Sequence, residues 1–327
     1  MSVSDMSDAQ QDRALGAFIG LAVGDALGAT IEFKPRDSYA PVTDMIGGGP
    51  FRLKPGEWTD DTSMALCLAD SLIANGGNID AADLADRFVR WWKHGENSVT
   101  GAFFDIGNAT RSALESYRET GRPVGSEDAY SAGNGGIMRL APVVLAAQGD
   151  AARAVTLARE QSWVTHAALE CLDGAEAVAW ILAAGVAGNG SDSLNAASDA
   201  DLGARKVKSL ASGSWRGKVR DEIRSTGYVV DTLEAALWAV GTSSSFEEAV
   251  LKAVNLGDDA DTVGAVAGQI AGAIWGYSNI PDRWRRRLAW HDRLVNSADA
   301  LWSIGGDETR IGGDLIPSSR GSKSAVT

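Results

Sequence analysis

The sequence predicts an all-helical fold, a single compact domain of many helices. Apolar residues recur at helical spacing through most of the chain, and clusters of glycine and proline separate these stretches. No segment alternates between apolar and polar residues as a half-buried strand does, and no repeat or long linker divides the chain. We therefore expect one helical domain over residues 1–303. A flexible tail, rich in glycine, serine and charge, is expected over 304–327.

The first helix is expected over about residues 12–29, with glycine at every fourth position: Gly16, Gly20, Gly24 and Gly28. Glycine weakens a helix, so this stripe predicts the close approach of another backbone. A loop dense in glycine and proline follows over residues 34–57. The later helices are expected near 58–73, 79–92, 108–120, 141–187 (with breaks near 149 and 165), 194–226 (a peripheral pair), 228–238, 246–254, 263–275 and 281–300.

Composition limits the partners and the compartment. A net charge of -13 over 327 residues argues against a nucleic-acid backbone or an anionic membrane as the main partner. Cys67 and Cys171 lie in apolar helical patterns, where a free cysteine behaves as a small buried side chain, so no disulfide framework is expected. The first residues lack the pattern of a secretory signal, and no apolar run suits a membrane span. We predict a cytoplasmic protein.

Two acidic clusters stand at the starts of helices expected in the core. Residues 257–262 read Gly-Asp-Asp-Ala-Asp-Thr before an almost wholly apolar stretch, and residues 58–63 read Trp-Thr-Asp-Asp-Thr-Ser before another. Aspartate often caps a helix N-terminus, and for either cluster alone this is the simpler explanation. If the clusters meet, however, their carboxylates repel one another unless protons or cations are held between them. With no Cys or His nearby, such a shared site favours Mg²⁺ or Mn²⁺.

Two weaker signals lie between the clusters. The Gly-Asn-Gly-Gly run at residues 133–136 can present backbone N–H groups to an anion, but taken by itself an ordinary turn is the better explanation. His166 is either a ligand contact or a hydrogen-bonded residue at a helix start. The three histidines of the chain show no metal-ligand spacing.

Together these segments resemble the ADP-ribosylglycohydrolase family, including its dinitrogenase reductase-activating and arginine-specific branches. The resemblance implies a compact all-helical domain. It also implies metal-dependent hydrolysis of the bond between ADP-ribose and an acceptor, with arginine favoured, an ADP-ribosylated protein or small molecule as substrate and ADP-ribose as product. The matching segments follow family order at residues 20–33, 58–62, 105–108, 131–139, 165–166, 227–232 and 257–262.

The resemblance also implies individual roles. Two Mg²⁺ ions, or Mn²⁺, would be held by Thr59, Asp60, Asp61, Asp259, Asp261 and Thr262. Asp105 and Glu32 are the candidate catalytic residues, with Asp105 favoured as general base. The substrate-contacting positions are Asn108, Asn134, Gly135, Gly136, His166 and Tyr228. Asp258 is not counted as a ligand, because relatives often carry glycine there.

Several alternatives stay open at this point. ADP-ribosylserine or O-acetyl-ADP-ribose could be the substrate, or a two-metal phosphohydrolase could use the same ligand types on a nucleotide. A non-catalytic ADP-ribose-binding protein is a further alternative, against which the complete ligand set counts. Acceptor recognition is open, because Glu127, Asp128 and Ala129 compete for the place of an acidic residue of the arginine branch.

Overall fold

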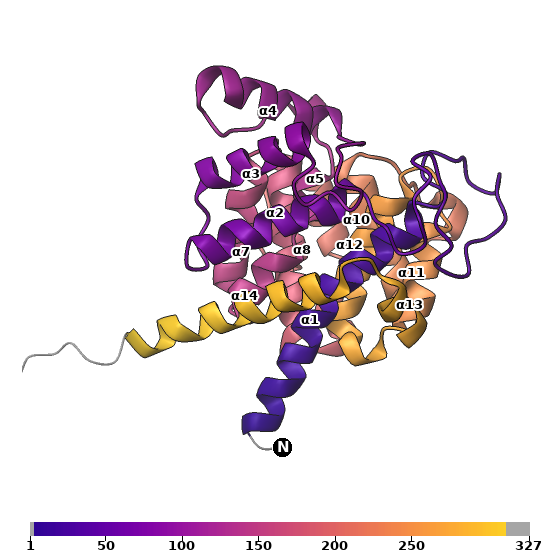
Figure 1. Ribbon diagram of the computed structural model, residues 1–327. Coiled ribbons are helices and arrows are strands. Elements are labelled where there is room, and N and C mark those ends of the chain that lie inside the picture. The colour runs from indigo at the N-terminus through magenta and orange to yellow at the C-terminus, as the bar shows by residue number, and fades with distance from the viewer. Residues whose placement is uncertain (1–2, 312–327) are drawn as a thin grey trace, which may run out of the picture.

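Helices make up the regular structure of residues 3–311, the part of the chain that this computed structural model describes (Figure 1). Over those residues there are isolated β-bridges but no strand, so the all-α prediction is confirmed. The helices are α1 (Val3–Gly28), α2 (Asp60–Ala74), α3 (Ala81–His94), α4 (Asn108–Thr120), α5 (Gly135–Met138), α6 (Ala141–Ala146), α7 (Ala151–Trp163), α8 (Leu169–Ala187), α9 (Arg205–Ala211), α10 (Val229–Gly241), α11 (Phe246–Val254), α12 (Ala260–Trp275), α13 (Asp282–Arg287) and α14 (His291–Ile311).

The glycine stripe of α1 packs against α12, which confirms the predicted close approach of another backbone. A Cβ atom at Gly20 would lie 2.2 Å from the carbonyl oxygen of Gly268, and one at Gly24 would lie 1.9 Å from that of Gly264. The helices run antiparallel, because Gly28 at the end of α1 meets Ala260 at the start of α12. This packing brings the C-terminal end of α1 to the N-terminal end of α12.

Helix α12 is buried over nearly its whole length, as its apolar sequence predicted. All residues from Ala260 to Ala273 are buried. The one polar side chain in its interior, Gln269, donates a hydrogen bond of 2.8 Å to the carbonyl oxygen of Ile137 in α5. The acidic residues at its start therefore stand at the entrance to the core.

Several boundaries differ from the expectation. Helix α1 begins at Val3, nine residues before its predicted start near residue 12. The predicted last helix is two helices, because Ala289 donates its N–H to the carbonyl oxygen of Gly56 and Trp290 takes a left-handed conformation (φ 54°). In the polar region 194–226, one α-helix, α9, and short 3₁₀ turns replace the predicted pair. Helix α14 continues to Ile311 and so includes the first residues of the tail expected over 304–327, of which residues 312–327 lie outside the described residues.

The two cysteines are buried free thiols, as predicted. Among the described residues, no helix combines the length and the apolar character that crossing a bilayer requires.

Candidate metal centre and substrate pocket

The N-terminal ends of α2 and α12 bring three carboxylates together. One oxygen from each of Asp60, Asp61 and Asp261 lies within 4.8 Å of the other two. The hydroxyl oxygen of Thr59 lies 3.4 Å from Asp61 Oδ2 and 3.1 Å from Asp261 Oδ2, a residue 202 positions away. The two acidic clusters of the sequence therefore form one site.

Helix capping does not account for these carboxylates. The N-cap residues of α2 and α12 are Thr59 and Asp259, and neither makes a side-chain capping hydrogen bond. Asp80 and Asp150 show the contrast, since their side chains accept backbone N–H bonds at the starts of α3 and α7. Asp60, Asp61 and Asp261 stand in the first turns of α2 and α12, where the helix dipole favours acidic residues, but none of them is the N-cap residue of its helix.

Asp25 of α1 fixes the start of α2. Its fully buried carboxylate accepts four hydrogen bonds. Thr59 donates its N–H and hydroxyl at 2.9 Å each, and Thr62 donates its N–H at 3.0 Å and its hydroxyl at 2.6 Å. The sequence interpretation gave Asp25 no role. The signal was a single charged residue on an otherwise small and apolar helix face.

The carboxylates of this site are costly to ionise. Burial raises the pKa values of Asp60, Asp61 and Asp261 well above the ordinary range, and neighbouring carboxylates raise them further. Burial also raises the pKa of Asp25 to about 6, against the lowering effect of its four hydrogen bonds. Such a group of acids is stable when it holds protons or when cations balance its charge.

The donor set fits a divalent cation. Asp61 Oδ1, Asp261 Oδ1 and Glu32 Oε2 are buried oxygens that have no hydrogen-bond partner among the residues the structure describes. Carboxylate and hydroxyl oxygens are the ligands that Mg²⁺ and Mn²⁺ prefer. The unpaired oxygens of the acidic cluster are therefore available to a metal ion.

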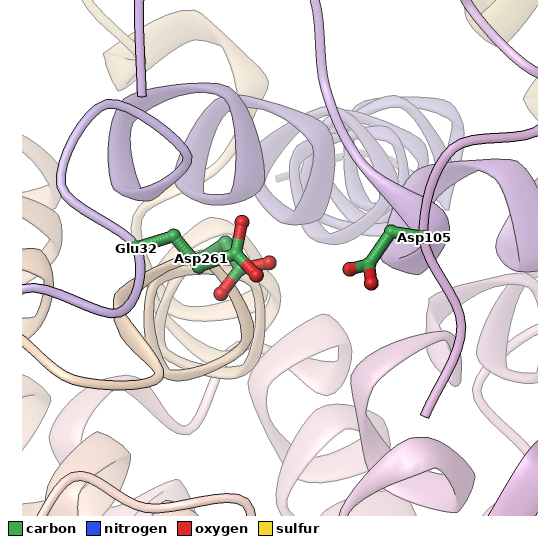
Figure 2. A group of neighbouring side chains, drawn as sticks. All are labelled: Glu32, Asp105 and Asp261. Carbon is green, nitrogen blue, oxygen red and sulfur yellow. The ribbon is translucent and has the colours of Figure 1, made fainter. Parts of the chain in front are cut away.

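Glu32 and Asp105 lie next to this cluster and belong to a second acidic group. Oxygens of Glu32, Asp105 and Asp261 lie within 4.8 Å of one another, so Asp261 belongs to both groups. Figure 2 shows Glu32 beside Asp261 and Asp105 facing them from the other side. Glu32 follows α1, and Asp105 precedes α4. Burial is the main cause that raises the pKa of both side chains.

A cavity of about 1420 Å³ opens beside these carboxylates. Most of the predicted site residues line it: Glu32, Asp60, Asp105, Asn108, Asn134, Gly135, His166, Tyr228, Asp259, Asp261 and Thr262. Thr59 and Asp61 are fully buried and are not part of the lining. Gly136 is not part of it either, because it packs against α7, where an added Cβ would lie 2.3 Å from Ser162 Oγ.

Two predicted substrate-contacting residues also form hydrogen bonds with other side chains. Asn134 donates to Asp259 Oδ2 at 2.6 Å and to Thr232 Oγ1 at 2.9 Å, so it fixes a predicted metal ligand. The Tyr228 hydroxyl accepts a hydrogen bond of 2.8 Å from Lys206 Nζ. Asp258, which was not counted as a ligand, is exposed and has a left-handed backbone (φ 53°).

Comparison with known proteins gives the family. Residues 6–310 match the family model described as ADP-ribosylglycohydrolase. ADP-ribosylarginine hydrolase Tri1 of Serratia proteamaculans (strain 568) is 47% identical over 91% of this chain and 81% of its own length. The Tri1 of Pseudomonas putida (strain GB-1) is 49% identical over 89% of this chain and 78% of its own length.

A more distant relative and a solved structure agree. The ADP-ribosyl-[dinitrogen reductase] glycohydrolase of Rhodospirillum rubrum is 34% identical over 90% of this chain and 97% of its own length. A solved structure described as an ADP-ribosylglycohydrolase-related protein complex superposes with a TM-score of 0.78 at 43% identity, covering 91% of this chain and 99% of that one. The chain belongs to the ADP-ribosylglycohydrolase family.

Proposed function

We propose that this protein hydrolyses the N-glycosidic bond between ADP-ribose and an arginine side chain. The observation that carries the proposal is the buried acidic cage at the wall of a cavity of about 1420 Å³. The choice of arginine rests on two relatives that are named ADP-ribosylarginine hydrolases and are close to half identical to this chain. The substrate is an ADP-ribosylated protein or a small molecule, and one product is free ADP-ribose.

The cage is proposed to hold two divalent ions, Mg²⁺ or Mn²⁺. Their ligands would be Thr59, Asp60, Asp61, Asp259, Asp261 and Thr262. Bound ions of this kind supply a Lewis acid that orients a sugar diol and stabilises charge as the glycosidic bond breaks. The unpaired oxygens of Asp61 and Asp261 support this assignment.

Asp105 is the proposed general base. Burial raises the pKa of Asp105, but its carboxylate accepts the N–H of Ile106 at 2.9 Å, and this bond, together with the charge of Arg111, works against that rise. Glu32 is less suited, because its Oε2 is buried without a partner and burial, followed by the charge of Asp261, raises its pKa. Of the two carboxylates, Asp105 is the one with contacts that favour its ionised form, so it is the better candidate to take a proton from water.

A release assay tests the proposed activity. Purified protein is given ADP-ribosyl-arginine, ADP-ribosyl-serine and O-acetyl-ADP-ribose, each with Mg²⁺ and with excess chelator. We expect free ADP-ribose from the arginine substrate, at a rate that chelator abolishes.

Any other outcome of this assay points to one of the alternative functions. Preference for the serine or acetyl substrate would refute the arginine assignment. Release of AMP or phosphate would indicate a phosphohydrolase. Binding of ADP-ribose without any turnover would indicate a non-catalytic reader.

A further inference from the structure

Arg139 is a charged side chain buried without an ionic partner. It is fully inaccessible to solvent, and within the described residues it forms no salt bridge. Its guanidinium donates to Gln161 Oε1 (2.9 Å), to the Gln161 carbonyl oxygen (3.1 Å) and to Thr165 Oγ1 (2.8 Å). The group also stacks on the ring of Phe88, with its Cζ 4.5 Å from the ring centroid. A cation is costly to bury, so its position calls for a role.

Thr165 links this cation to His166. The Thr165 Oγ1 and His166 Nδ1 atoms are 2.8 Å apart, and both side chains are buried. The Thr165 hydroxyl oxygen already accepts a hydrogen bond from Arg139. For the hydroxyl hydrogen, His166 Nδ1 is the one acceptor within reach among the described residues. If Nδ1 carried a hydrogen, the hydroxyl hydrogen would be buried without a partner, at a cost of about 1–3 kcal/mol. Nδ1 is therefore the acceptor, and the ring hydrogen is on Nε2.

The imidazole edge with Nε2 faces the pocket over the glycine loop. His166 lines the cavity together with Gly133 and Gly135. An added Cβ atom at Gly135 would lie 2.4 Å from His166 Cε1 and 2.9 Å from Nε2. Nε2 makes no hydrogen bond within residues 3–311. Glycine at this position of the loop therefore leaves space for the imidazole ring, and Nε2 is free to bond to a ligand.

We propose that Arg139 and Thr165 are positioning residues that hold His166 as the neutral tautomer with its hydrogen on Nε2, so that this N–H donates to an oxygen of the bound ADP-ribosyl group. The proposal rests on the proposed function only for the identity of the ligand. The tautomer itself is a property of the protein without ligand.

The electrostatics of the pocket suit a neutral donor. The lining holds no lysine or arginine side chain among the described residues, while Glu32, Asp60, Asp105, Asp258, Asp259 and Asp261 all line it. Burial, and then the charge of Arg139, lower the pKa of His166 to about 3. Burial lowers the pKa of Arg139 to about 9, which leaves it charged at neutral pH. The positive charge of Arg139 therefore lies outside the pocket lining. The donor that faces the pocket, the Nε2–H of His166, is uncharged and does not repel divalent ions.

The tautomer can be read directly by NMR. The chain has three histidines, so the long-range ¹H–¹⁵N spectrum of uniformly labelled protein is simple, and His94→Gln and His291→Gln variants assign the other two. At neutral pH we expect the His166 signals of an unprotonated Nδ1 and a protonated Nε2. An imidazolium pattern, or a hydrogen on Nδ1, would overturn the proposal whether or not any variant folds.

A matched pair of variants tests the role of Thr165. Thr165→Val keeps the shape but removes the hydroxyl, and Thr165→Ser keeps the hydroxyl. We expect Thr165→Val to populate both tautomers and to bind ADP-ribose roughly tenfold more weakly, the loss expected for one hydrogen bond. Thr165→Ser should retain the wild-type tautomer and an affinity within about twofold of wild type.

Other results have distinct meanings. If Thr165→Val keeps the wild-type tautomer and affinity, Thr165 positions nothing and the proposal fails. If the wild-type protein shows the expected tautomer but does not bind ADP-ribose, the assigned ligand and the proposed function fail together, while the tautomer assignment stands.

Discussion

At the scale of single residues, the site depends on side chains that place others. Asp25 receives four hydrogen bonds from Thr59 and Thr62, and Asn134 donates a hydrogen bond to Asp259. The predicted ligands Thr59 and Asp259 are thus positioned by side chains that are not predicted to bind metal. Support of this kind typically changes metal affinity by 10- to 100-fold when it is removed. The acids that would contact metal were visible in the sequence as two motifs. Asp25 stood out only as a lone charge on an apolar helix face, and its role was not predictable, because its four donors lie 34 and 37 positions away.

Replacing Asp25 by asparagine should weaken the metal site. The amide offers one acceptor oxygen in place of two, so the donors of Thr59 or of Thr62 would face an NH₂ group. We expect Asp25→Asn to lower Mg²⁺ affinity by about 10- to 100-fold and the free energy of unfolding by roughly 2 kcal/mol. Isothermal titration and chemical denaturation measure the two effects. Asp201→Asn, at an exposed position, is the control and should change neither.

Replacing Asp261 should have opposite effects on the metal-free and metal-bound protein. Asp261 belongs to both acidic groups, and its Oδ1 is buried without a partner. At pH 8 without metal, Asp261→Asn should raise the free energy of unfolding by about 1 kcal/mol, because one buried like charge is removed. With Mg²⁺, hydrolysis should fall by more than about 100-fold. A variant destabilised in chelator would show that charge repulsion does not strain the metal-free site.

At the scale of elements, the contact between α1 and α12 aligns the parts of the site. The opposed glycines set the end of α1, which carries Asp25 and leads to Glu32, against the start of α12, which carries Asp261. The stripe was predictable because its four-residue spacing is a helical pattern within one element. The break between α13 and α14 was not, because the chain turns where Ala289 bonds to Gly56, more than 230 positions earlier.

For a glycine substitution on this face of α1, helix propensity and helix packing predict stability changes of opposite sign. Helix propensity alone predicts that Gly20→Ala stabilises the protein by about 1 kcal/mol. The structure predicts a loss of about 3 kcal/mol, because the added Cβ would lie 2.2 Å from the Gly268 carbonyl oxygen. Chemical denaturation decides between them. Gly203→Ala is the matched control, since its Cβ would have ordinary contacts of 3.5 Å or more, and its stability should be close to wild type.

At the scale of the whole molecule, folding, protons and metal are linked. The folded state raises the pKa values of Asp25, Asp60, Asp61 and Asp261, with burial as the main cause. For such groups, the folded protein binds more protons than the unfolded chain. Their stabilising effect is present below the unfolded pKa of about 4 and is lost as the pH rises through the folded values. A divalent cation replaces those protons and should remove the loss.

Thermal unfolding against pH tests this linkage. In chelator, the melting temperature should fall by roughly 5 °C between pH 5 and pH 8. With saturating Mg²⁺, it should stay level or rise over the same range, and the ion should stabilise the protein more at pH 8 than at pH 5. Equal stabilisation at both values would show that protons and metal do not compete for this cluster.

The fold class and most residues of the pocket could be predicted from the sequence, because helical periodicity and short motifs are local. The hydrogen bonds that join Arg139, Thr165 and His166 could not. Arg139 and Thr165 lie within the family-like segments 131–139 and 165–166. Their connection to His166 depends on the packing of α7 against the glycine loop, where Gln161 donates to the carbonyl oxygen of Gly136. Gly136, which is predicted to contact the substrate, does not line the cavity, and a Cβ atom there would lie 2.3 Å from Ser162 Oγ. Neighbours in one motif can thus face different sides of the backbone.

The most direct test of the account is the position of metal in a crystal. Crystals soaked in Mn²⁺ give anomalous difference peaks wherever the ion binds. We predict two peaks between the starts of α2 and α12, both within coordination distance of carboxylate oxygens from Asp60, Asp61 or Asp261. An empty cluster, or manganese bound only elsewhere on the protein, would contradict the claim that these acids form one metal cage.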